Sequence, residues 1–168
     1  LIELVKKNYE DLNKDDSIIE NIKGIIHNEI QNKKGYFKCV SIDFLNQLSD
    51  FEKDKNQPVY SCSIAAEFVE QLLGCLIEIE DPENRNPEDP LKITSQITAA
   101  NTLQSLYNHN SQVIFTSIRD FFNKFIGSQN WIEVHAAIFS VYALCQQSNE
   151  IEKTYSETVK EFIDTIFP

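Results

Sequence analysis

The chain has 168 residues, of which 42% are hydrophobic, and its formal net charge at pH 7 is −11. This acidic excess argues against nucleic acid as a partner, because binding phosphates requires clustered lysine and arginine, so basic protein segments are the expected electrostatic partners. No apolar run approaches the 18 residues that a membrane-spanning helix needs, and no membrane insertion is expected.

Apolar residues recur at helical spacing along nearly the whole chain, and no strand pattern competes with them. The spacing predicts a first helix from Leu1 to about Asn13. A second helix is expected to begin at Ser17, whose hydroxyl forms a capping box with Glu20. The residues expected on its buried face are Ile18, Ile22, Ile25, Ile26 and Ile30.

The middle of the chain predicts two further helices. After a turn at residues 32–35, the third helix places Phe37, Val40, Ser41, Phe44, Leu48 and Phe51 at helical intervals. The fourth runs from about Val59 to Glu80. The residues on its apolar stripe are Ala65, Phe68, Val69, Leu72, Leu76 and Ile79.

An acidic segment, residues 78–90, ends the fourth helix. Its three prolines forbid helix continuation, and it holds six acidic residues against one arginine, which is nearly half of the net charge of the chain. We expect it to contact basic surface on a protein partner; the alternative is a solvated linker that keeps the protein soluble. The candidate contact residues are Glu80, Asp81, Glu83, Glu88 and Asp89.

Four more helices are predicted after the acidic segment. The fifth runs from about Lys92 to His109, and the sixth from Gln112 to Ile126, where Gly127 is expected to end it in a left-handed conformation. The seventh is capped by Asn130, with Glu133 reaching back, and should bury Val134, Ala137, Ile138, Val141 and Cys145. The eighth begins with a capping box of Thr154 and Glu157. Its inward residues are Tyr155, Val159, Phe162, Ile163 and Ile166.

The sequence offers no residues arranged for catalysis or for a cofactor. The three histidines, His27, His109 and His135, lack the spacing of a metal site, and no glycine-rich phosphate loop occurs. The cysteines form no C-x-x-C pair and are expected to be buried, reduced thiols; they are Cys39, Cys62, Cys75 and Cys145. We therefore expect a protein that is not an enzyme and binds no metal or cofactor.

The predicted helices include an internal sequence repeat. The small pair Ala99-Ala100 recurs 37 residues later as Ala136-Ala137, and each copy is followed by a second amphipathic helix. That period is typical of HEAT and armadillo solenoids. We predict an all-α HEAT-repeat α-solenoid of about four antiparallel hairpins stacked in a right-handed superhelix, with the third, fifth and seventh helices on the inner side. The repeats are about residues 1–32, 33–82, 83–128 and 129–168, and because Leu1 to Val5 looks like the middle of a helix, we expect a piece of a longer solenoid.

Several segments resemble the importin-β (karyopherin-β) family of nuclear transport receptors. The stretch from Asn130-Trp131 to Ala136-Ala137 is similar to the family's segment D/N-W-R-x-R-E/D-A-A-V-x-A-F. Ile42-Asp43-Phe44 is similar to the family's segment I-E-F-W. Between them, a long helix containing residues 68–76, the acidic segment and then Ala99-Ala100 follow the order found in the family.

The resemblance implies a function in nucleocytoplasmic protein import. It implies three kinds of partner: basic segments of cargo or of an importin-α-like adaptor, phenylalanine-glycine repeats of nucleoporins, and RanGTP. It also implies that the chain occurs in the cytoplasm, in the nucleus and at the nuclear pore of the envelope. The alternative is a HEAT-repeat scaffold for protein complex assembly that is unrelated to transport. Scaffolds generally use short turns between repeats, whereas here a long acidic segment interrupts the array.

Overall fold

The structure is a computed structural model, and it describes residues 2–12, 16–33, 35–55, 60–78, 94–145 and 160. The described residues form helices and no strand, in agreement with the all-helical prediction. The helices are α1 (Ile2–Lys7), α2 (Tyr9–Leu12), α3 (Asp16–Asn32), α4 (Tyr36–Lys55), α5 (Ser61–Ile77), α6 (Ser95–Tyr107), α7 (Ser111–Phe125) and α8 (Trp131–Cys145). Of the predicted helix after Thr154, the structure describes Lys160 alone.

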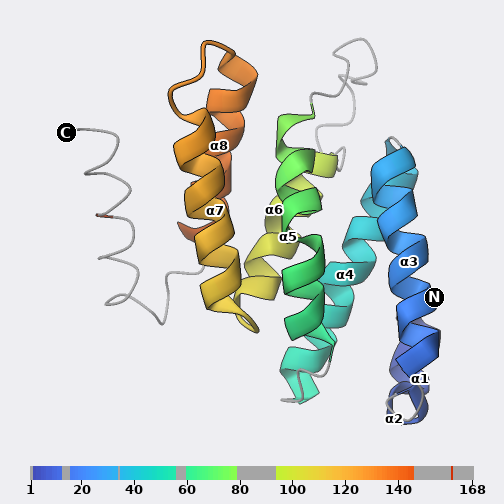
Figure 1. The fold of residues 1–168 in the computed structure, drawn as a ribbon. Coiled ribbons are helices and arrows are strands. Elements are labelled where there is room, and N and C mark those ends of the chain that lie inside the picture. The colour runs from blue at the N-terminus through green and yellow to red at the C-terminus, as the bar shows by residue number, and fades with distance from the viewer. Residues whose placement is uncertain are drawn as a thin grey trace, which may run out of the picture.

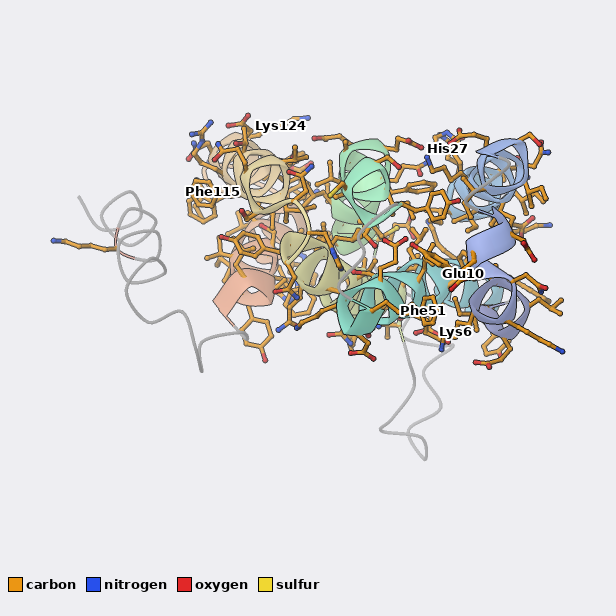
Figure 2. All side chains as sticks on the ribbon, turned by 90° about the horizontal axis from the view of Figure 1, so that it is seen from below. Lys6, Glu10, His27, Phe51, Phe115 and Lys124 are labelled. Atoms are coloured by element: carbon orange, nitrogen blue, oxygen red, sulfur yellow. The ribbon has the colours of Figure 1, made fainter. Side chains whose placement is uncertain are left out.

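The helices lie in two rows that pack face to face (Figure 1). In one row α1 contacts α4, α4 contacts α6 and α6 contacts α8; in the other, α3 contacts α5 and α5 contacts α7. Figure 2 shows the first row with Lys6 and Phe51, and the second with His27, Phe115 and Lys124. From α3 onward, helices that follow each other in the chain alternate between the rows. This arrangement is compatible with an α-solenoid, and the four-repeat division and the superhelix stay predictions.

Apolar side chains fill the space between neighbouring helices. Those of Phe68 and Leu72 in α5, Leu103 in α6 and Phe122 in α7 are almost completely buried. Burying a side chain of this size stabilises a fold by about 1.5–3 kcal/mol. The two alanine pairs at 99–100 and 136–137 are buried as well, which agrees with their predicted place at close helix contacts.

In three helices, the face that is buried differs from the predicted apolar face. In α3, Ile18 and Ile25 are exposed, whereas the neighbouring Ile19 and the predicted Ile26 are buried. In α4, Phe37 is 68% exposed and Val40 also faces solvent, because Cys39, Ile42 and Leu45 face the core instead. In α8, Ile138 is 53% exposed and Ser140, Ala143 and Leu144 are buried. The predicted stripe of α5 through Ala65, Phe68, Val69, Leu72 and Leu76 is confirmed.

Two predicted helix boundaries are also corrected. The first helix divides into α1 and α2 at Asn8, whose side-chain amide donates to the Leu4 carbonyl at 2.8 Å and so competes with the helical backbone bonds. The helix α3 begins at Asp16, so Ser17 lies inside it rather than at its cap.

A glycine also differs from its predicted role. Gly127 does not adopt the predicted left-handed conformation; α7 ends through Ile126, whose backbone N–H donates to the Phe122 carbonyl at 2.9 Å. The left-handed glycine is Gly35, with φ of 62° at the start of α4.

The N-terminus of α8 agrees with its predicted cap. The Asn130 side chain accepts a hydrogen bond from the Ile132 N–H at 3.1 Å. Glu133 does not reach the Asn130 N–H directly; Ser128 accepts from that N–H at 3.0 Å and donates its own hydroxyl to the Glu133 carboxylate.

A buried carboxylate joins three helices. Glu52 of α4 is fully buried and accepts hydrogen bonds from the hydroxyl groups of Tyr9 in α2 and Ser61 in α5. It also accepts from the backbone N–H groups of Tyr60 and Ser61, at 2.9 and 2.8 Å. The residue before α5, Tyr60, makes no side-chain cap, so Glu52 satisfies the free N–H groups of that helix end from another helix.

Candidate functional site

The acidic candidates named from the sequence lie outside the described residues. These are Glu80, Asp81, Glu83, Glu88 and Asp89. They lie in the chain that joins α5 to α6, residues 78–94, which we call the acidic connection. Of this connection only the two ends, Glu78 and Thr94, are described. The Glu78 carboxylate pairs with the buried Lys38 of α4. Near it, the Gln96 side chain of α6 donates to the Leu76 carbonyl of α5 at 2.9 Å. The start and the end of the acidic connection are therefore held at the same place in the fold.

A groove lies between α4 and α6, two neighbouring helices of one row. It has a volume of about 260 Å³. Its walls include Tyr36 and Val40 from α4 and Ile97 from α6, all three exposed. The remaining lining residues are Cys39, Asp43, Asn46, Thr98 and Asn101. The groove begins three residues after Thr94, where the acidic connection rejoins the helices.

The hydrogen bonds that link α4 to residues 95–109 lie mostly farther along the two helices than the groove. The Ser105 hydroxyl donates to Asp50 at 2.8 Å, and a ring nitrogen of His109 lies 2.9 Å from the Ser49 carbonyl oxygen. The Thr102 hydroxyl lies 3.4 Å from the Ile42 carbonyl oxygen. These contacts involve residues 42–50 and 102–109, whereas most of the groove residues lie before them in both helices.

Two polar residues of the groove lining carry hydrogen-bond acceptors. Oδ1 of Asn46 is buried and has no hydrogen-bond partner among the described residues. The half-buried Asp43 carboxylate accepts from Gln47, and its negative charge faces the groove without a salt bridge to any described residue. Oδ1 of Asn46 is therefore an unpaired acceptor inside the fold, which costs free energy, and it is closed to a ligand in the groove.

Cys39, Cys62 and Cys75 are free thiols. Burial raises the pKa of Cys75 to about 11, so its thiol stays protonated and poorly nucleophilic at neutral pH. Cys39 and Cys75 are buried free thiols, as predicted, while Cys62 is half-buried and donates to the His109 carbonyl. Among the residues that the structure describes, no group of three metal-ligating side chains comes together.

A second apolar surface lies on α8. His135, Ile138, Phe139 and Tyr142 line a shallow hollow, with the Phe139 ring stacked between those of His135 and Tyr142 at centroid distances of 5.8 and 5.7 Å. Trp131 is 67% exposed on the same helix. None of its four described lining residues is a buried polar side chain.

Sequence reasoning missed the groove. The sequence places Val40 on the apolar stripe of the third helix and gives Tyr36 no role, because periodicity identifies an apolar stripe without showing which part of it a neighbouring helix leaves uncovered.

Comparison with known proteins adds no relative: no protein-family model, no curated protein and no solved structure matches this chain. Within the described part of the chain, none of the helices combines the length and the apolar character needed to cross a bilayer.

Proposed function

We propose that this chain is a protein-binding segment of a nuclear transport receptor of importin-β type, and that it has no catalytic activity. In this proposal it binds basic segments of cargo or of an importin-α-like adaptor, nucleoporin repeats and RanGTP, and it moves between the cytoplasm, the nucleus and the nuclear pore. The transport-specific part depends on the resemblance of the sequence segments around the acidic segment.

One observation carries the protein-binding part of the proposal. Two neighbouring helices of one row, α4 and α6, leave an open groove beside the base of the acidic connection. An apolar groove with the Asp43 carboxylate in its lining suits a partner that is both apolar and basic. Stacked helices also suit such a role, because small changes at each interface add up to a large change in curvature.

Binding to Ran tests the transport-specific part. We expect the parent protein that contains this chain to bind Ran loaded with GTP at least tenfold more tightly than Ran loaded with GDP, measured by biolayer interferometry. Equal binding of both forms, or none, would contradict the transport proposal and favour a HEAT-repeat scaffold unrelated to transport.

A further inference from the structure

We draw no further inference here: the strongest candidate, the shallow hollow on α8 lined by His135, Ile138, Phe139 and Tyr142, carries none because nothing in the structure shows what covers it.

Discussion

Glu52 shows how a single residue can fix the relation of three helices. A carboxylate that is fully removed from water is tolerated only when donors satisfy its oxygens, and here two hydroxyl groups and two backbone N–H groups do so. We predict that Glu52→Gln lowers the free energy of unfolding by about 1–3 kcal/mol, because the amide brings N–H donors toward other donors and removes the charge.

Urea denaturation of Glu52→Gln and of a matched control measures this effect. The control is Asp54→Asn, which removes the same charge from an exposed position of α4 and should change the free energy of unfolding by less than about 0.5 kcal/mol. Equal effects of the two substitutions would show that the hydrogen bonds of Glu52 contribute little.

Lys23 makes the stability of the fold depend on pH in the alkaline range. Its Nζ atom lies 2.8 Å from carboxylate oxygens of both Glu20 and Glu67, and so links α3 to α5. Burial on its own lowers the pKa of Lys23, but the hydrogen bonds and charges of Glu20 and Glu67 outweigh it, and the pKa is raised above the ordinary value of 10.5. The protonated form is therefore favoured by folding.

The sign of the effect follows from that shift. The stabilisation by Lys23 is fully present below pH 10.5, its ordinary pKa, and is lost as the pH rises through the higher value of the folded protein. We predict that Lys23→Met reduces the fall in thermal midpoint that accompanies this titration, whereas Lys53→Met, at an exposed position, does not. An unchanged alkaline profile of Lys23→Met would contradict the role of the two ion pairs.

At the scale of the element, α8 tests the importance of close helix contacts. Ala137 is fully buried, while the next residue, Ile138, is 53% exposed. We predict that Ala137→Trp destabilises the chain by about 1–3 kcal/mol or more, because a large ring must displace the packed neighbours. Ile138→Trp should leave the urea midpoint nearly unchanged. A similar loss of stability in both variants would show that the Ile138 side chain also packs against a neighbouring part of the protein.

The elements themselves could be predicted from periodicity, but the direction of each face could not. At residues 18–19 and 25–26, α3 has two adjacent isoleucines, so two neighbouring stripes are equally apolar, and only the position of α4 and α5 decides that Ile19 and Ile26 are buried. The groove had the same difficulty, because it is formed by α4 and α6 together. The bonds of Glu52 to Tyr9, 43 residues away, depend equally on the assembled fold.

At the scale of the whole molecule, the acidic segment is expected to accelerate association with basic partners. We predict that replacing Glu80, Asp81, Glu83, Glu88 and Asp89 with the corresponding amides slows association with a lysine-rich peptide and flattens the dependence of the association rate on salt. Stopped-flow fluorescence at low and high salt measures both quantities.

A second variant of equal net charge shows whether position matters. It neutralises five exposed acidic residues of the helices: Glu3, Glu10, Asp54, Glu70 and Asp120. We expect a smaller effect on the association rate from this variant. Identical salt dependence in both variants would support a solvated linker that acts only through the total charge.

The hydrogen bond from Gln96 to Leu76 has a consequence for the chain entropy of the acidic connection. This contact holds Leu76 and Gln96 together, and the entropy of closing a flexible loop between two such points changes only with the logarithm of its length. Halving such a loop alters the free energy of folding by about 0.6 kcal/mol. Deleting residues 83–88 should therefore leave the urea midpoint almost unchanged, so that the length and charge of the loop can vary independently of the helices. A loss of several kcal/mol would instead mean that the loop packs against the helices.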